Sequence, residues 1–333
     1  MDKPDVTLPS LYLTQIIELL DERGIDTRAW LAASSFDADQ LTNETLSLSW
    51  QALRSLLADT QRLLPHQPLG LLLGSRLLIN THGSLGYAAM SGGSARQVID
   101  LLVRFLHLRT DLMSIQVAEH DDLLHLHFVE NRPLQQLKPV LTETIMLAVR
   151  NILDFIMLGA CPIQQVYFPF NGDAAVARRY FECPVTYQAG WAGFTLPVAN
   201  IDKPLKLANK RGFESALRVC EEELHKLTAN EDLSSRVRRT LLQSQTGFPS
   251  LDMAAQRFYM TKATFHRHLC KEGTSYRDIL ESVRQQLALR YLEEGHMTIK
   301  EIAYALGYAE LSNFRKAFKR WYGKAPSQYL KQG

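Results

Sequence analysis

Two short segments in the last third of the chain gather basic side chains among small hydrogen-bonding ones. They are Thr264, His266 and Arg267 in the first segment, and Ser312, Asn313, Arg315 and Lys316 in the second. Such groups donate and accept hydrogen bonds in the way that base edges in a DNA major groove require. We treat all seven as candidate base-reading residues. Lys262, Lys319 and Arg320 lie beside them and are candidate phosphate contacts, which position a protein without reading sequence.

The elements that must hold these residues form a pattern that occurs twice. The first copy runs over 251–258 and 261–269, and the second over 299–307 and 309–318. The copies align with a drifting offset, which is 48 residues for Ala255 and Ala303 and 50 residues for Gly273 and Gly323. Phe258 and Leu306 also correspond, as do Phe265 and Phe314.

Each copy has the features of a helix-turn-helix. A small residue, Ala255 or Ala303, stands where a second helix would cross closely. Apolar pairs at i, i+4 spacing, Phe265 with Leu269 and Phe314 with Phe318, give the second helix an inward stripe. We expect Thr261 and Glu310 to cap these second helices. The predicted motifs cover about 251–271 and 299–321.

A continuous helix is predicted between the two motifs, over 276–293. Ile279, Val283, Leu287 and Leu292 roughly mark an apolar stripe, and neither Pro nor Gly interrupts the segment. About 17 residues would span roughly 26 Å. Such a strut suits two recognition helices held about 34 Å apart, one turn of DNA. The alternative is an ordinary helical bundle with an accidental repeat.

The segment from about 232 to 333 resembles the DNA-binding domain of the AraC/XylS family of bacterial transcription regulators. The resemblance is strongest over 299–308 and 313–326. The first motif departs from the family at Tyr259, where members often have Gly, and at His268, where a second Arg often follows. The resemblance implies an all-α domain with two helix-turn-helix motifs joined by a long helix.

Charge separates the same two parts of the chain. Residues 232–333 hold 17 Lys and Arg against 9 Asp and Glu, a charge of +8, whereas residues 1–231 hold 20 against 26, a charge of −6. A basic domain joined to an acidic one is typical of a DNA reader with a separate sensing part. The basic side chains would bind phosphates by counterion release, so affinity should fall with salt.

The remaining composition indicates a cytoplasmic protein of two domains. The 333 residues suffice for two cores. The four cysteines form no C-x-x-C pair, which argues against a disulfide scaffold or a zinc ribbon. We expect no secretory signal at the polar start of the chain. The apolar run 69–79 is too short to span a bilayer, so no membrane partner is expected.

The N-terminal part is predicted to be a mixed α+β domain. Predicted helices cover 11–23, 49–64, 94–110, 139–157 and 205–227, and predicted strands cover 112–119, 123–129, 166–170 and 194–196. We place an effector-binding and dimerisation domain at 1–228, a linker at 229–231 and the DNA-binding domain at 232–333.

This part resembles the branch of the family typified by the ornithine-utilisation regulator, which has an arabinose-binding-type ligand domain. The resembling segments are 69–74, 83–89, 166–169 and 180–185. The resemblance implies a small effector, which in relatives is a fatty acid, an amino acid or an aromatic acid, and it implies a homodimer.

Other groupings in this part carry less weight. His125 and His127 share one strand face near His120, but no Cys, Asp or Glu completes a metal-ligand spacing, so a solvated or pocket-lining pair is the better interpretation. Gly83-x-x-Gly86 and Gly92-Gly93 match no phosphate loop and are interpreted as turns. Any one of three arginines could clamp an acidic effector; these are Arg104, Arg109 and Arg150.

The sequence thus predicts a DNA-binding transcription activator, acting with RNA polymerase and controlled by an effector of the N-terminal domain. No metal, cofactor or catalytic residue is expected, and the effector-binding residues stay unassigned. Two alternatives remain open: control by a protein partner, and an enzymatic N-terminal domain fused to a DNA-binding one, for which no catalytic motif is present.

Overall fold

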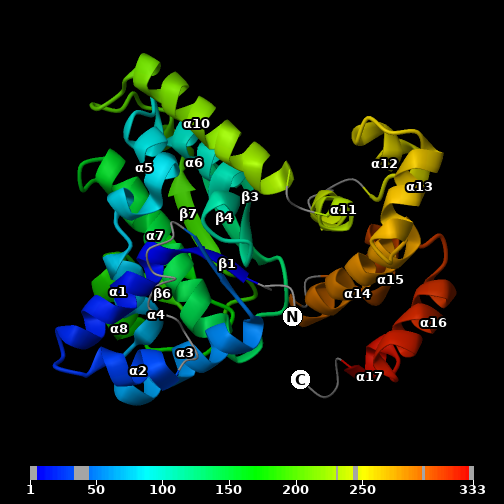
Figure 1. The fold of residues 1–333 in the computed structure, drawn as a ribbon, viewed down its shortest axis with the longest axis horizontal. Coiled ribbons are helices and arrows are strands. Elements are labelled where there is room, and N and C mark those ends of the chain that lie inside the picture. The colour runs from blue at the N-terminus through cyan, green and yellow to red at the C-terminus, as the bar shows by residue number, and fades with distance from the viewer. Residues whose placement is uncertain (1–5, 34–44, 230–231, 243–246, 295–296, 330–333) are drawn as a thin grey trace. The chain divides into compact units, whose positions relative to one another are not determined.

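The computed structural model describes residues 6–33, 45–229, 232–242, 247–294 and 297–329. It contains two compact units, residues 1–225 and 226–333 (Figure 1). Positions 230 and 231 of the linker predicted at 229–231 lie outside the described residues. Among the described residues, no helix is both long enough and apolar enough to cross a membrane.

A five-stranded sheet of order β3-β4-β7-β5-β6 forms one layer of the first unit. Its strands are β3 (Met113–His120), β4 (Leu123–Glu130), β5 (Gln165–Tyr167), β6 (Val185–Thr186) and β7 (Gly193–Pro197). Neighbours are antiparallel except β5 and β6, which are parallel. The hairpin between β3 and β4 turns at Asp121 and Asp122, where φ is +51° and +61°. Short acidic residues tolerate this left-handed region better than bulky ones.

Helices and a second, two-stranded sheet build the rest of the first unit. The sheet pairs β1 (Val6–Pro9) with β2 (Thr45–Leu48). The helices are α1 (Ser10–Asp21), α2 (Thr27–Ala33), α3 (Trp50–Leu63), α4 (Leu69–Arg76), α5 (Gly83–Met90), α6 (Ala95–Phe105), α7 (Lys138–Ile156), α8 (Ala174–Phe181), α9 (Val198–Ile201) and α10 (Lys210–Ala229). Short 3₁₀ turns are η2 (Ile79–His82), η3 (Leu106–Leu108) and η4 (Gln135–Leu137).

The close contact between α4 and α7 explains two glycines of the apolar run. A Cβ added at Gly70 would lie 2.6 Å from Oε2 of Glu143, and one added at Gly74 would lie 2.8 Å from Cβ of Leu147. The side chain of Asn151 donates to the Gly74 carbonyl over 3.0 Å. The two glycines therefore let α7 approach the α4 backbone, which places α4 against the centre of the core.

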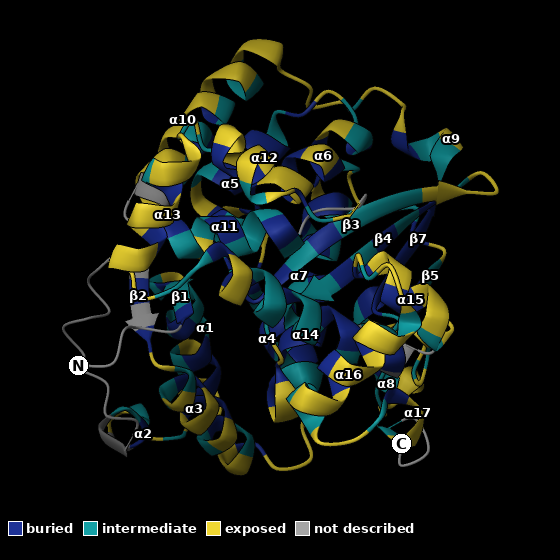
Figure 2. Ribbon diagram, turned by 90° about the vertical axis from the view of Figure 1, so that its right-hand side faces the viewer, coloured by how far each residue is buried: buried dark blue, intermediate teal, exposed yellow. Residues whose placement is uncertain are grey.

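The described residues of the second unit form helices and connecting turns, with no strand among them. Its helices are α11 (Leu233–Leu242), α12 (Leu251–Arg257), α13 (Lys262–Lys271), α14 (Tyr276–Glu294), α15 (Ile299–Ala305), α16 (Leu311–Tyr322) and α17 (Pro326–Tyr329). A single apolar cluster joins α11 to α16. In Figure 2, α12, α13 and α16 show many exposed positions, whereas those of α14 are mostly intermediate or buried. The predicted mixed N-terminal domain and helical C-terminal domain are confirmed.

Several boundaries differ from those predicted. The helix predicted over 94–110 ends at Phe105 and continues as η3, and the one predicted over 205–227 begins only at Lys210. The strand predicted over 166–170 is shorter and covers Gln165–Tyr167. The interpretation of Gly83-x-x-Gly86 as a turn was wrong, because both residues belong to α5. A Cβ at Gly86 would lie 2.0 Å from the Ile79 carbonyl oxygen, so this glycine serves close packing.

Candidate nucleic-acid interface and effector cavity

The two helix-turn-helix motifs repeat down to individual backbone hydrogen bonds. The Met260 amide donates to the Ala255 carbonyl over 3.0 Å, and the Tyr308 amide donates to the Ala303 carbonyl over 2.9 Å. Both alanines are buried. Each first helix thus ends in the same tight turn, which sets the angle of the second helix.

Capping fixes where three of these four helices begin. The Ser250 side chain accepts from the Met253 amide and the Thr261 side chain from the Thr264 amide. Thr298 forms a capping box with Glu301. Glu310 is the N-cap residue of α16, as predicted, but its carboxylate accepts from the Ser312 hydroxyl over 3.0 Å and forms no hydrogen bond with a backbone amide of the helix.

Apolar pairs hold the recognition helices α13 and α16 in place. Phe265 and Leu269 on α13 are fully buried, and so are Phe314 and Phe318 on α16. The pairs lie at the i, i+4 spacing read from the sequence. Because these pairs fix the inward faces, the candidate residues between them must point outward.

Six of the seven candidate base-reading residues are exposed; these are His266, Arg267, Ser312, Asn313, Arg315 and Lys316. Thr264 is half-buried, and its hydroxyl accepts from that of Thr261 over 3.0 Å, so it belongs to the cap of α13. His266 lies 3.6 Å from Sγ of Cys270. Within the described part of the chain, Arg267, Arg315 and Lys316 form no ion pair.

The three candidate phosphate contacts differ in their surroundings. Lys262 lies 3.2 Å from a carboxylate oxygen of Asp252, with both side chains exposed. Arg320 forms an ion pair with Glu281 of α14, and Trp321 donates to the same carboxylate over 3.0 Å. The Trp321 and Arg320 hydrogen bonds lower the pKa of Glu281. Lys319 is exposed and makes no ion pair with any residue the structure describes.

One arginine that supports the second motif was not found from the sequence. Arg284 of α14 donates from Nε to the Leu306 carbonyl over 2.9 Å. Its guanidinium lies 4.9 Å from the ring centroid of Tyr308 and 5.5 Å from that of Phe248. Arg284 therefore ties the turn of the second motif to the long helix. No local spacing signals this role, because its partners lie more than twenty positions away in either direction.

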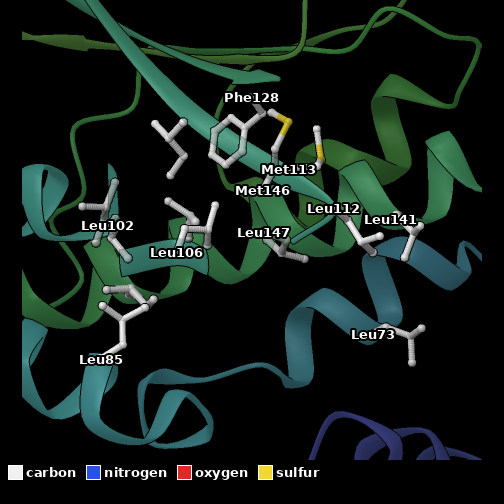
Figure 3. Packing of buried hydrophobic residues seen from close by; sticks show 14 of the residues in the cluster. Leu73, Leu85, Leu102, Leu106, Leu112, Met113, Phe128, Leu141, Met146 and Leu147 are labelled. Atoms are coloured by element: carbon white, nitrogen blue, oxygen red, sulfur yellow. The ribbon is translucent and has the colours of Figure 1, made fainter. Parts of the chain in front are cut away.

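The first unit contains an apolar cavity of about 110 Å³. Its walls come from β1, β2, α1, α3, α4, η2, α5, α6, η3 and α7, and most of its lining side chains are leucine, isoleucine and valine. Figure 3 shows four of the lining residues among the buried side chains of this unit: Leu73, Leu85, Leu102 and Leu106. Among the residues that the structure describes, no Asp or Glu lines the cavity.

Three polar side chains gather at one place in this lining: Tyr12, His82 and Arg109. The Tyr12 hydroxyl and Nδ1 of His82 are 2.9 Å apart. Burial, and then the nearby Arg109, lowers the pKa of His82 to about 4, so its imidazole is neutral at pH 7. Nε2 of His82 and Nε of Arg109 are buried and have no hydrogen-bond partner within the described residues. The nearby Leu77 carbonyl raises the pKa of His82 slightly, but it does not form a hydrogen bond of normal geometry with the imidazole.

The three candidate arginines are all engaged by acids, but only Arg109 lines the cavity. Nη2 of Arg109 donates to Glu223 of α10 over 3.1 Å and to the Ser84 hydroxyl over 3.0 Å. Arg104 pairs with Glu221 over 2.8 Å, and Arg150 pairs with Glu182. The structure thus separates one arginine that lines the cavity from two that pair with acids away from it.

The histidines of β4 pack with aromatic rings on one face of the sheet. The rings of His125 and His127 are 6.1 Å apart, and His127 lies 4.4 Å from Trp191. Burial, and then neighbouring histidines, lowers the pKa of both. Among the described residues, no group of three or more His, Cys, Asp or Glu side chains is placed to hold a metal ion.

Comparisons with known proteins agree over both units. Residues 24–205 match the family described as the arabinose-binding domain of AraC transcription regulator, N-terminal, and residues 254–332 match a helix-turn-helix domain family. The ornithine utilization regulator of Pseudomonas aeruginosa is 32% identical over 326 residues, covering 97% of this chain and 96% of the regulator. An uncharacterised helix-turn-helix-type transcriptional regulator of Mycobacterium tuberculosis is 28% identical over 97% of this chain and 96% of its own length.

One solved structure aligns with both units. The transcriptional regulator CdpR from Pseudomonas aeruginosa is 24% identical, covers 91% of this chain and 96% of its own, and gives a TM-score of 0.45.

Proposed function

The chain belongs to the AraC family of transcription regulators, and we propose that it is a sequence-specific transcription activator whose two recognition helices read adjacent segments of a major groove. One observation carries this proposal. The two motifs share the same turn hydrogen bonds and the same buried aromatic anchors, and each presents exposed cations on its second helix. This arrangement supports paired docking in successive turns of one duplex.

The assignment of roles follows from exposure and ion pairing. Arg267, Arg315 and Lys316 are the cations free to approach base edges, and His266, Ser312 and Asn313 supply neutral hydrogen-bonding groups. We assign phosphate contacts to Lys319, Lys262 and Arg320. Lys262 would compete with its ion pair to Asp252, and Arg320 with its ion pair to Glu281, whereas Lys319 has no such competitor among the described residues. Thr264 contributes through the cap that starts α13.

We further propose that a small effector enters the N-terminal cavity and that the regulator acts in the cytoplasm as a homodimer with RNA polymerase. The apolar cavity with convergent polar groups supports an effector site, because such cavities are the usual form of small-molecule sites. The relatives are named as regulators, so we propose no catalytic role for this unit.

Selection of duplexes from a random pool by the full chain tests the DNA-reading role. Arg267→Ala and Lys316→Ala should each relax preference at a different position, at a cost of about 1–3 kcal/mol in binding. Arg62→Ala, which removes an exposed cation of the first unit, is the matched control and should leave selection unchanged. Unchanged affinity and preference in both recognition-helix variants would contradict the placement of α13 and α16.

A further inference from the structure

We infer that the N-terminal cavity takes a carboxylic acid with an apolar tail, and that the carboxylate of this ligand displaces Glu223 from Arg109. The inference rests on the proposed function, since it names the class of effector and the way in which the effector acts. It concerns contacts within the first unit only.

The lining selects for the tail. Nearly all of it is aliphatic, contributed by elements from β1 to α7, and polar atoms are confined to a few positions. A straight hydrocarbon chain fits such a surface without leaving a polar group unpaired. Each methylene that enters should improve affinity about fourfold until the cavity is full.

The polar side chains select for the head group. Arg109 brings a positive charge to a lining whose described residues include no acid, so an anion is favoured there and an ammonium group is disfavoured. Nε of Arg109 and Nε2 of His82 are buried, and neither has a hydrogen-bond partner in the described part of the chain. His82 is neutral and its Nδ1 is bonded to Tyr12, so its proton lies on Nε2 when the Tyr12 hydroxyl donates. A carboxylate has two oxygens that can accept from these two donors.

The present partner of Arg109 connects the cavity to α10. Glu223 accepts from Nη2 of Arg109 over 3.1 Å and from the Ser84 hydroxyl over 2.8 Å. Its side chain is 39% exposed, whereas that of Arg109 is 14% exposed, so the pair runs from the interior to the surface. A ligand carboxylate on the inner side competes for the same guanidinium. Weakening of the Arg109–Glu223 pair loosens α10, the helix that ends the first unit and continues to Ala229.

Calorimetric titration of the full chain with octanoate, octanol and L-ornithine tests the ligand class. Octanoate should bind at least about tenfold more tightly than octanol, because only the acid pairs with Arg109. L-Ornithine, with ammonium groups and no apolar tail, should bind more weakly than octanoate. Equal binding of the acid and the alcohol, or tighter binding of ornithine, would overturn the inference.

Variants of the ion pair test the exchange. Glu223→Gln removes the internal competitor, so octanoate should bind about tenfold more tightly. Arg109→Met should abolish the preference for octanoate over octanol. If this variant does not fold, Arg109→Lys replaces it in the test. The Lys side chain keeps the charge but lacks Nε, so the preference should be reduced. Arg104→Met is the matched control, because Arg104 also pairs with α10 but does not line the cavity. It should bind octanoate as the wild type does.

Hydrogen exchange of the α10 amides reports the coupling. Octanoate should raise exchange over 210–229 in the wild type, and Glu223→Gln should show raised exchange without ligand. Unchanged hydrogen exchange in both cases, or unchanged octanoate affinity in Glu223→Gln, would refute the displacement of Glu223 from Arg109 by the ligand. If the chain still binds duplex DNA, that failure leaves the proposed function intact. If octanoate binds but no duplex does, the proposed function fails instead.

Discussion

Tyr259 in the first helix-turn-helix occupies the same place in the turn as Gly307 in the second, and both have positive φ, +55° and +75°. The amides of both residues donate to the carbonyl three positions earlier, over 3.0 Å and 2.9 Å. Only glycine adopts this backbone region without steric cost. The first motif therefore carries strain that the second avoids.

Replacing Tyr259 with glycine should stabilise the second unit. The Tyr259 side chain is wholly exposed, so the substitution removes no packing. Relief of the left-handed backbone should outweigh the extra freedom of the unfolded chain and raise the free energy of unfolding by about 0.5–1 kcal/mol. Urea denaturation measures the change, and an unchanged or lower midpoint would show that the turn is not strained.

The opposite substitution in the second motif should destabilise it. Gly307→Ala places a Cβ in the left-handed region and 3.2 Å from Nη2 of Arg284. We expect a loss of about 1–2 kcal/mol, measured in the same urea experiment. Arg284 also holds the Leu306 carbonyl, so displacement of its guanidinium would disturb the turn itself. A neutral result would mean that Arg284 moves aside freely.

Lys319 and Arg320 are adjacent and equally charged, but they should respond differently to alanine. Lys319 makes no ion pair with the described residues, so Lys319→Ala should leave the unfolding midpoint unchanged and reduce the salt slope of duplex binding by about one. Arg320 pairs with Glu281, so Arg320→Ala should also lower the free energy of unfolding, by up to about 1 kcal/mol. Parallel denaturation and salt titrations compare them, and equal unfolding midpoints would show that the Glu281 pair is not stabilising.

The parts of the fold that local patterns describe were predictable. The tandem repeat places both recognition helices, and the alternation over 123–129 gives β4 nearly to its observed bounds. Helices α4 and α5 were missed, because segments 69–76 and 83–90 are apolar on all sides and contain glycines. Such segments show no helical period, and only the packing of α4 on α7 reveals why the glycines are there.

The polar end of the cavity could not be predicted as a cluster. Tyr12 and His82 are 70 positions apart, and Arg109 and Glu223 are 114 positions apart, so no spacing links them. The sequence named Arg109 only as one of three equivalent arginines. Arg109 differs from the other two because its side chain lines the apolar cavity, and this is a property of the assembled fold. The partner of the Glu310 side chain could not be predicted either. Its residue type suits a helix start, but the carboxylate accepts from the Ser312 hydroxyl and not from a backbone amide.

A buried carboxyl on α7 should make stability depend on pH. Glu143 is buried and accepts from the Tyr187 hydroxyl over 2.8 Å. Burial raises its pKa to about 7, although the Tyr187 hydrogen bond opposes the shift. Since the folded protein then binds this proton more tightly than the unfolded chain, the contribution of Glu143 is most favourable below the ordinary value of 4.5 and declines as pH rises to about 7.

Glu143→Gln should remove this dependence and stabilise the protein at pH 8 by about 2 kcal/mol. His82 has the opposite dependence, because its lowered pKa gives stability that is lost as pH falls from 6.5 towards 4. The two effects partly cancel between these values in the wild type, so the comparison must be between variants. Thermal or urea unfolding at several pH values should show the gain of the Gln variant growing from acid to neutral pH. A gain that does not vary with pH would mean that Glu143 does not titrate in this range.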